Sequence, residues 1–232
     1  MQLPSYRELA KMIDHSLLKP TMTESELEAG CRLALEYDVA SVCIMPYYLA
    51  RCSALLAGSD VLPTTTIGFP HGGQVSAVKR LEAERALDDG ARELDMVVNV
   101  SQVLSGNYAA VRSDVLAVLE PTRARGAKLK LIFENCYLNE AQKIRLCELC
   151  GELGVDWAKT STGFGSSGAT LEDLRLMRRH CPPQVQVKAA GGIQDLEMLL
   201  KVRETGATRS GCSKTDVVLD ELRRRLALAA QS

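Results

Sequence analysis

Two hydrophobic patterns alternate along the chain. Short apolar runs rich in β-branched residues, such as ASVCIM (40–45) and LKLIFE (129–134), have the length and composition of buried strands. Longer stretches with helical periodicity, such as SAVKRLEAERALDD, separate these runs. The chain contains eight apolar runs of this kind, and each is a predicted strand: 11–16, 40–45, 63–69, 93–100, 129–134, 156–161, 185–190 and 208–213.

Glycines mark where the helical stretches end. Gly90, Gly126, Gly154 and Gly206 each close a helical pattern and are followed by Ala or Val and then by a predicted strand. Glycine is favoured at such positions because it adopts the left-handed conformation that ends a helix. Strands that alternate with helices in this order usually pair in parallel. Eight repeats predict an α/β fold, a closed (β/α)8 TIM barrel, and the pattern leaves an open doubly wound sheet as the alternative.

Length and composition fit this architecture and narrow the possible partners. No linker or low-complexity segment divides the 232 residues, so we expect residues 1–232 to form a single domain. The net charge of −1 gives no electrostatic reason to expect a nucleic acid or a membrane surface as partner. The chain has no apolar run of membrane-spanning length and no signal-peptide pattern at its start, so a cytoplasmic location is expected.

Cysteines and histidines do not form a recognisable metal site. The three histidines are spread along the chain without ligand spacing. Cys147 and Cys150 form one C-x-x-C within a helical pattern, but no second pair follows it. We therefore expect no metal ion, and we expect the eight cysteines to be buried and reduced.

In a TIM barrel the chemistry lies where strands end and the following loops begin. The predicted strand ends are rich in ionisable and polar side chains for segments that are otherwise apolar. The candidates are Asp14, Cys43, Asp95, Asn99, Glu134, Lys159, Lys188 and Ser213.

Two lysines among these candidates point to covalent chemistry. Lys159 and Lys188 belong to consecutive β/α units, so a barrel places them side by side. Apolar surroundings and a neighbouring cation both lower the pKa of a lysine, and an uncharged amine can attack an aldehyde to form a Schiff base. Asp95 could balance the second lysine and move protons. From the residues alone, lysines that are solvated or that bind a phosphate as plain cations remain the alternative.

Glycines near the end of the chain suggest a phosphate site. Gly191 and Gly192 follow the seventh predicted strand, and the run GCSK (211–214) follows the eighth. Loops at these two places form the usual phosphate site of TIM barrels, from backbone N–H groups and a helix start. Ser213 could add a hydroxyl and Lys214 a charge. Tight turns without a ligand are the alternative.

A second glycine pattern resembles a dinucleotide-binding loop. Gly163, Gly165 and Gly168 have G-x-G-x-x-G spacing. A dinucleotide site needs this pattern in the first β/α unit, with an acidic residue about 20 positions later for the ribose. Here the pattern lies in the sixth unit, and the residues at that distance read QVQVKAAG. We therefore expect no nicotinamide cofactor.

Several motifs together resemble the deoxyribose-phosphate aldolase family. KTSTGF and VKAAGG in one chain are specific, and the resemblance spans roughly residues 13 to 213. In chain order the matching segments are IDHSLLKP (13–20), SVCIMP (41–46), IGFPHG (67–72), ELDMVVNV (93–100), NCYL (135–138), KTSTGF (159–164), VKAAGGI (187–193) and GATRSG (206–211).

The resemblance implies a class I aldolase on a TIM barrel that needs no metal or cofactor. Such enzymes reversibly cleave 2-deoxy-D-ribose 5-phosphate to D-glyceraldehyde 3-phosphate and acetaldehyde. Lys159 would form the Schiff base, Lys188 would lower the pKa of Lys159, and Asp95 would relay protons. The resemblance also implies a homodimer or homotetramer. The substrate-binding residues would be Asp14, Gly163, Gly191, Gly192, Gly211 and Ser213.

One departure keeps other functions open. The family's phosphate loop commonly has a second serine where this chain has Lys214. An aldolase of the same barrel type that acts on a different or unphosphorylated aldehyde is therefore one alternative. A phosphate-binding barrel without activity is another, although a pure binder has no need for the set of Asp95, Lys159 and Lys188.

Overall fold

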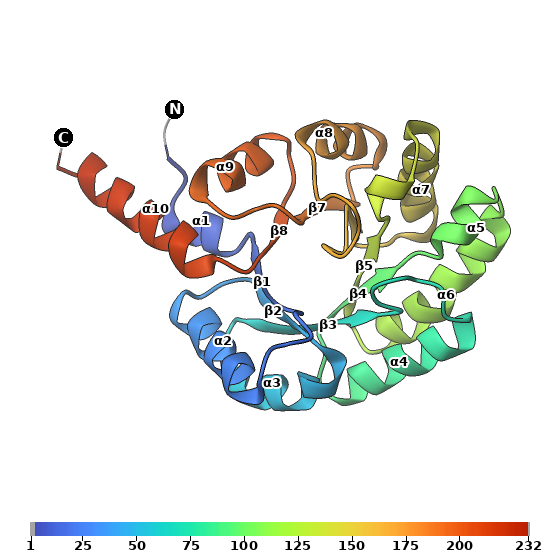
Figure 1. Cartoon of the computed structure of the whole chain (residues 1–232), viewed down its shortest axis with the longest axis horizontal. Coiled ribbons are helices and arrows are strands. Elements are labelled where there is room, and N and C mark those ends of the chain that lie inside the picture. Colours follow the sequence, from blue (N-terminus) through green and yellow to red (C-terminus); the bar gives the residue numbers. More distant parts are fainter. Residues whose placement is uncertain (1–2, 232) are drawn as a thin grey trace.

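Eight parallel strands close into a barrel in the computed structural model, which describes residues 3–231. Each strand pairs with the next along the chain, and the last pairs with the first, so the open sheet is excluded and the predicted TIM barrel is confirmed (Figure 1). The strands are β1 (Ile13–Leu17), β2 (Ser41–Ile44), β3 (Leu62–Ile67), β4 (Glu93–Val97), β5 (Lys128–Ile132), β6 (Trp157–Lys159), β7 (Gln186–Ala190) and β8 (Arg209–Cys212).

All eight predicted strands are present, but several end earlier than expected. The predicted strand 93–100 stops at Val97 because Asn99 begins the next helix, where its side chain accepts a hydrogen bond from the Gln102 N–H. The predicted strand 63–69 stops at Ile67 because Gly68 has a φ of +64° and turns the backbone. Apolar residues continue past both points, so hydrophobicity alone overestimates the strand length.

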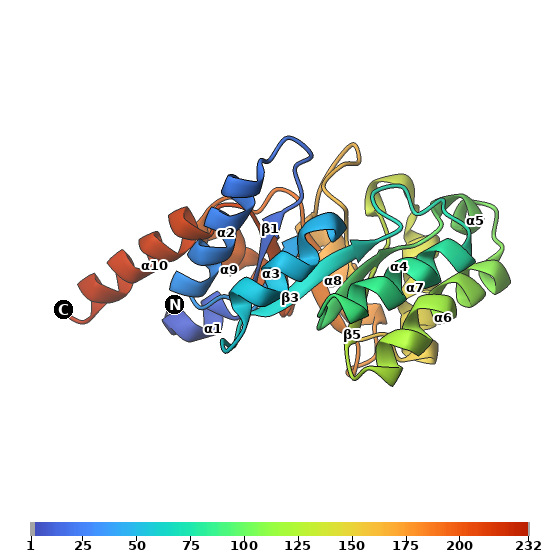
Figure 2. The ribbon, with the colours of Figure 1, turned by 90° about the horizontal axis from the view of Figure 1, so that it is seen from below.

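Helices follow the strands and cover the outside of the barrel (Figures 1 and 2). Both views show α10 extending beyond the barrel toward the C-terminus. The α-helices are α1 (Tyr6–Ala10), α2 (Glu24–Glu36), α3 (Leu49–Leu56), α4 (Ser76–Asp88), α5 (Val100–Leu104), α6 (Tyr108–Ala124), α7 (Glu140–Leu153), α8 (Leu171–His180), α9 (Leu196–Glu204) and α10 (Thr215–Ala229). Two 3-10 turns are η1 (Pro46–Tyr48) and η2 (Asn135–Tyr137).

Helix ends agree with the sequence signals. The four glycines predicted to end helices all have positive φ, between +65° and +99°. At α7, for example, Gly154 lies in the left-handed region and its N–H bonds the Cys150 carbonyl. The same helix begins with a capping box between Asn139 and Gln142. These local signals set the lengths of the helices between the strands.

The barrel interior is polar, whereas the layer between strands and helices is apolar. Side chains alternate along each strand, so Leu94 and Met96 of β4 join the apolar core outside the barrel while Glu93 and Asp95 are buried inside it. Alternate strands supply four inward side chains to each layer of a TIM barrel. From the amino end, the layers are Ser41, Glu93, Trp157 and Arg209; Asp14, Thr64, Lys130 and Lys188; and Cys43, Asp95, Lys159 and Gly211.

Such layers usually consist of bulky apolar residues. Here seven of the twelve positions are charged, so the strands that form the fold also concentrate the chemistry at its centre.

The cysteine prediction holds with one exception. All eight cysteines are free thiols and seven are buried, but Cys136 is only partly buried. It follows β5 in the η2 turn, where the chain leaves the barrel for the surface. Within residues 3–231, no helix combines the length and apolar character that a membrane span requires.

Candidate active site

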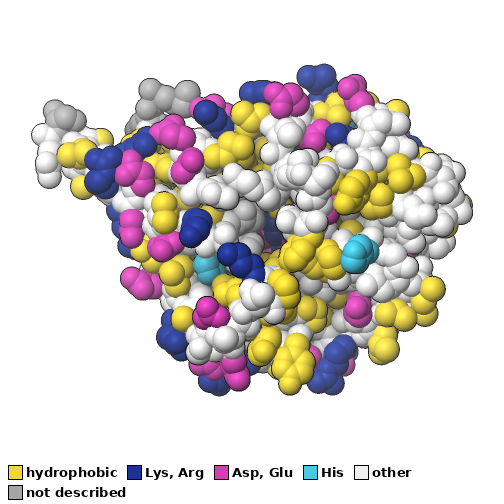
Figure 3. Space-filling view, viewed as in Figure 1, with side chains coloured by type: hydrophobic (Ala, Val, Ile, Leu, Met, Phe, Trp, Pro, Cys, Tyr) yellow, Lys and Arg dark blue, Asp and Glu magenta, His cyan; other side chains and the backbone are white. Residues whose placement is uncertain are grey.

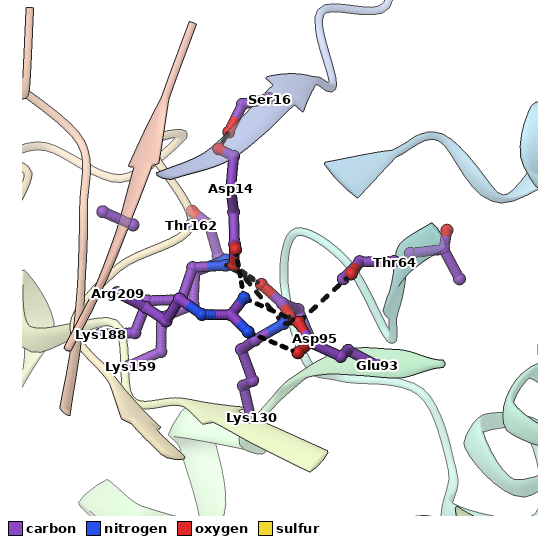
Figure 4. Close-up of polar contacts among 12 residues, drawn as sticks. Asp14, Ser16, Thr64, Glu93, Asp95, Lys130, Lys159, Thr162, Lys188 and Arg209 are labelled. Carbon is purple, nitrogen blue, oxygen red and sulfur yellow. Dashed lines mark hydrogen bonds and ion pairs between the residues drawn. The ribbon is translucent and has the colours of Figure 1, made fainter. Parts of the chain in front are cut away.

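Lys159 and Lys188 lie directly opposite each other on the paired strands β6 and β7. Only 3% of Lys159 and 1% of Lys188 is exposed. Both Nζ atoms contact the same oxygen of Asp95, with Nζ–Oδ2 distances of 2.6 Å for Lys159 and 2.8 Å for Lys188 (Figure 4). The predicted neighbours are therefore in contact through one carboxylate.

Three predicted residues lie deeper than expected. Lys159 is the last residue of β6, but Asp14, Asp95 and Lys188 lie within their strands and point into the barrel. The expectation that all four stand at strand ends was wrong. Charged side chains can occupy the interior because each finds a partner of opposite charge there.

Sequence reasoning missed three charged residues of the same network. Lys130 of β5 contacts Glu93 at 2.5 Å and Asp95 at 2.9 Å. Arg209 of β8 contacts Asp14 at 2.5 Å and Glu93 at 2.8 Å. The signal was present as charges at every second position of ELD (93–95) and KLK (128–130), which is the spacing of one strand face.

The network has one more cationic group than carboxylates when every group is ionised. The carboxylates belong to Asp14, Glu93 and Asp95, whereas the cations belong to Lys130, Lys159, Lys188 and Arg209. A buried cluster that excludes water disfavours uncompensated charge. Loss of one proton from one lysine makes the cluster neutral.

The surroundings indicate which lysine loses that proton. Burial, followed by the charge of Lys188, lowers the pKa of Lys159 against the opposing effect of Asp95. Burial also acts to lower the pKa of Lys188, but Asp14 and Asp95 outweigh it and raise that pKa. The expectation that each lysine lowers the pKa of the other therefore holds for Lys159 only. The two lysines are suited to different roles, Lys159 as the uncharged amine and Lys188 as the ammonium group.

Asp95 remains a carboxylate between these lysines. Its burial acts to raise its pKa, but the charges of Lys130, Lys159 and Lys188 outweigh burial and hold the pKa of Asp95 below its usual range. Asp14 has a lowered pKa for a similar reason, because Arg209, Lys188 and Lys130 outweigh its burial.

A cavity of about 320 Å³ opens above Lys159. Four of the six predicted substrate-binding residues line it, namely Gly163, Gly191, Gly211 and Ser213. Among them, Gly163 and Gly191 have φ values of +88° and +83°, which favour glycine. Figure 3 shows the hollowed centre of this face, with Lys and Arg side chains on one side and hydrophobic side chains on the other.

Two predicted substrate-binding residues are not in the cavity wall. Asp14 is buried beneath it and bonded to Lys188 and Arg209. Gly192 follows Gly191 in the loop after β7, and its φ of +87° shapes the turn, while a Cβ at this position would meet nothing within 4 Å. Asp14 and Gly192 therefore support the residues of the cavity wall and are not part of that wall.

The glycines of the G-x-G-x-x-G pattern each have a different structural reason. Gly163 lines the cavity. A Cβ at Gly165 would lie 2.7 Å from Cys136 Sγ, and one at Gly168 would lie 2.5 Å from the Gly191 carbonyl oxygen. The spacing thus reflects close packing of the loop after β6 against the loops after β5 and β7.

Glu134 holds this loop from the end of β5. Its carboxylate accepts hydrogen bonds from the Thr162 N–H, at 3.2 Å, and from the Thr162 hydroxyl. Glu134 is buried and adopts a left-handed conformation with φ of +56°, which is uncommon for a residue other than glycine. The sequence predicted Glu134 only as a candidate at a strand end, and its contacts with Thr162 place it beside the cavity that Thr162 lines.

The remaining candidates do not reach the cavity. Cys43 is buried in β2, where desolvation and the charge of Asp95 raise the pKa of its thiol to about 11. Asn99 caps α5. Among residues 3–231, no group of three His, Cys, Asp or Glu side chains could hold a metal ion. The absence of a cofactor stays a prediction.

Comparisons with known proteins agree with the geometry of the site in pointing to an aldolase. A model of the DeoC/LacD family of aldolases matches residues 9–213. The chain is 59% identical over 225 residues to the deoxyribose-phosphate aldolase of Rhodopirellula baltica, covering 97% of this chain and 93% of the relative. It is 46% identical over 209 residues to the deoxyribose-phosphate aldolase of Thermococcus kodakarensis, covering 89% and 93%.

A solved structure extends the comparison to three dimensions. The deoxyribose phosphate aldolase of Aeropyrum pernix, described as a unique tetramer, superposes with a TM-score of 0.87. The two chains are 30% identical, and the match covers 95% of this chain and 93% of the other. The likeness therefore includes the whole barrel and not only its motifs.

Proposed function

The chain belongs to the DeoC/LacD family of aldolases, and we propose that it uses Lys159 to cleave a phosphosugar. It is a deoxyribose-phosphate aldolase, a carbon–carbon lyase that reversibly converts 2-deoxy-D-ribose 5-phosphate to D-glyceraldehyde 3-phosphate and acetaldehyde. The observation that most supports the role of Lys159 is the Asp95 oxygen that Lys159 and Lys188 share.

The first step needs an uncharged amine. The pKa of Lys159 is lowered, and its Nζ donates a hydrogen bond to Asp95 Oδ2 at 2.6 Å. The free amine attacks C1 of the open-chain sugar and, after loss of water, forms a protonated imine. Because C1 gains an electron-withdrawing iminium group, the bond between C2 and C3 is weakened.

Bond cleavage requires removal of the C3 hydroxyl proton. We assign this step to a water molecule activated by Asp95 and Lys188, which are held 2.8 Å apart. The electron pair of the C2–C3 bond passes into the iminium to give an enamine, and C3 becomes the aldehyde carbon of glyceraldehyde 3-phosphate. Protonation of the enamine at C2 and hydrolysis of the resulting iminium release acetaldehyde and restore Lys159. This chemistry uses neither a metal ion nor an organic cofactor.

The far end of the cavity suits a phosphate group. Gly191 and Gly211 leave room for backbone approach, and Ser213 offers a hydroxyl just before α10 begins at Thr215. A second cavity adjoins this one, and both are lined by Lys19 and Ser213. Lys214 lines the second cavity only, so its action on the phosphate as a point charge in place of the missing serine is part of the proposal.

A homo-oligomer is part of the proposal. The Aeropyrum pernix relative is described as a tetramer, and we propose a homodimer or homotetramer for this chain. Light scattering during size-exclusion chromatography measures the mass in solution, and a purely monomeric species would reject this part.

Substrate cleavage tests the function as a whole. We expect the purified protein to release glyceraldehyde 3-phosphate from 2-deoxy-D-ribose 5-phosphate, with a higher kcat/KM than for unphosphorylated 2-deoxy-D-ribose. Lys159→Arg replaces the attacking amine with a permanent cation that cannot serve as the nucleophile, so it should abolish turnover of both sugars. Preference for the unphosphorylated sugar would reject the phosphate assignment, and turnover by Lys159→Arg would reject the role of Lys159.

A further inference from the structure

Glu93 and Arg209 form the lowest charged layer of the barrel, and we call them the floor pair. The Arg209 guanidinium donates to both Glu93 oxygens, with Nη2–Oε1 at 2.8 Å and Nη1–Oε2 at 3.1 Å. It also donates to Asp14 Oδ1 at 2.5 Å. Neither residue lines the cavity above Lys159, so any effect of the floor pair on the reaction passes through other groups.

Arg209 is fixed in place by its surroundings. Its side chain is only 11% exposed, and the guanidinium stacks over the Trp157 ring at 5.0 Å from the ring centroid. The planar fork matches the carboxylate geometry of Glu93, which a lysine could not reproduce. Because arginine is not deprotonated in proteins, this position carries a permanent positive charge.

The floor pair connects to both catalytic lysines through two short chains of contacts. Arg209 contacts Asp14, and the second oxygen of Asp14 contacts Lys188. Glu93 contacts Lys130, which in turn contacts Asp95, the shared partner of Lys159 and Lys188 (Figure 4). Asp14 can hold Lys188 and Arg209 together because its two oxygens serve different cations.

The floor pair affects the charge balance of the whole buried network. With Arg209 present, the three carboxylates are matched by Lys130, Lys188 and Arg209, so Lys159 is the cation in excess. Without Arg209, the same carboxylates need Lys159 as an ammonium group. Without Glu93, two carboxylates face four cations, and the pressure on Lys159 to lose its proton increases.

We propose that Glu93 and Arg209 are positioning residues that set the charge balance of the barrel interior and thereby keep Lys159 uncharged and Lys188 charged. This inference rests on the proposed function of Lys159 as the Schiff-base lysine. It assigns to the floor of the barrel a role in the reaction that occurs at its mouth.

The groups facing Lys159 come from several strands. Asp95 contacts Lys159 directly, and Lys188 contacts the same Asp95 oxygen. Cys43 of β2 also acts on Lys159 electrostatically. The charged groups behind them are Asp14 on β1, Glu93 on β4, Lys130 on β5 and Arg209 on β8. The test must therefore change the network charge in both directions.

The experiment measures how fast acetaldehyde is trapped on Lys159 by borohydride as a function of pH. Arg209→Met should raise the pH of half-maximal trapping by about one unit, and Glu93→Gln should lower it by about one unit. The double variant restores the charge balance and should return the midpoint to near that of the wild type. Arg209→Lys keeps the charge and should keep the midpoint, although it loses the fork.

A surface variant and the direction of the shifts separate this role from a structural one. Arg125→Met removes an exposed arginine paired with Asp88 and should leave the midpoint unchanged. Loss of folding stability would slow all floor variants without moving their midpoints in opposite directions. Should Arg209→Met not fold, the comparison of Glu93→Gln with Arg209→Lys still tests the proposal. The first variant should lower the trapping midpoint, and the second should leave it unchanged.

The outcomes also separate this inference from the proposed function. Trapping in the wild type, with midpoints of Glu93→Gln and Arg209→Met equal to its own, refutes the role of the floor pair alone. Absence of any adduct on wild-type Lys159 refutes the Schiff-base assignment, and the role of the floor pair falls with it.

Discussion

At the scale of single residues, Lys159 and Lys188 differ in their counter-ions although they lie side by side. Lys188 contacts Asp14 and Asp95, whereas Lys159 contacts no carboxylate of residues 3–231 other than Asp95. Burial acts to lower the pKa of both lysines, but only Lys188 has enough nearby negative charge for its pKa to be raised instead. One additional carboxylate therefore separates the pKa values of the two lysines, which supports the proposal that Lys159 attacks and Lys188 assists.

This difference predicts the result of removing Lys188. In Lys188→Met the nearby positive charge is lost and Lys188 no longer competes for the Asp95 oxygen that Lys159 contacts, so the pKa of Lys159 should rise. We expect kcat/KM at pH 7 to fall by about 100-fold or more, with partial recovery as the pH is raised. The measurement is a pH profile of substrate cleavage.

The matched control for that profile is Lys143→Met, which removes a partly buried lysine paired with Asp173 outside the barrel. It should leave the profile unchanged. Wild-type activity of Lys188→Met at pH 7 would contradict the division of roles between the two lysines.

At the scale of elements, the loops after β6 and β7 depend on each other. The Ala169 N–H donates to the carbonyl oxygens of Ala190 and Gly191, at 3.0 Å and 3.1 Å. Gly168 approaches Gly191 so closely that no side chain fits between them. The wall of the cavity that includes Gly163 and Gly191 is therefore one unit formed by two loops.

A methyl group at Gly168 should disturb this unit. Gly168→Ala places a Cβ 2.5 Å from the Gly191 carbonyl oxygen, so one loop must move. We expect KM for 2-deoxy-D-ribose 5-phosphate to increase about tenfold, while the rate of acetaldehyde trapping on Lys159 changes little. Gly73→Ala is the control, because its Cβ would meet nothing within 4 Å. Equal KM values for the two variants would contradict the coupling of the loops.

How far the sequence predicted these elements depended on the kind of signal. Strands and helix ends were predictable because periodicity and glycines act locally, as Gly154 shows. Strand ends such as Val97 and Ile67 were not, because a cap or a turn overrides hydrophobicity there. Glu134 was visible as a candidate, but its contact with Thr162 depends on two loops that only the folded barrel brings together.

The whole molecule adds what no single motif contains. Lys159, Lys188 and Asp95 were predictable because they lie in motifs with recognisable chemistry. Glu93, Lys130 and Arg209 were missed because the alternation of a strand shows that they share a face but not which partners the closed barrel gives them. The balance of seven charges is therefore a property of the barrel and not of its separate strands.

Stability at low pH follows from this buried network. The pKa values of Asp14 and Asp95 are lowered in the folded protein, because nearby cations outweigh the opposing effect of burial. Their contribution to stability is fully present above the pKa of an unfolded Asp, about 3.9, and is lost as the pH falls through the folded values. We expect the free energy of unfolding, measured by urea denaturation, to decrease steadily below about pH 4.

Asp95→Asn provides the comparison for this pH dependence. It removes one of the two lowered carboxyl groups, so the decrease of its unfolding free energy below that pH should be shallower than in the wild type. It should also be less stable at neutral pH, because three buried lysine side chains lose their shared carboxylate partner. An equally steep decrease in both proteins would contradict the lowered pKa of Asp95.

The most direct test of the account is to trap its covalent intermediate. The protein is incubated with acetaldehyde and borohydride at neutral pH, digested, and mapped by mass spectrometry. The account predicts that a single lysine, Lys159, gains C2H4, because an ethyl group replaces one hydrogen of its amine, and that 2-deoxy-D-ribose 5-phosphate with borohydride modifies the same lysine. An adduct on Lys188 in place of Lys159, or no adduct on either lysine, would contradict the central claim.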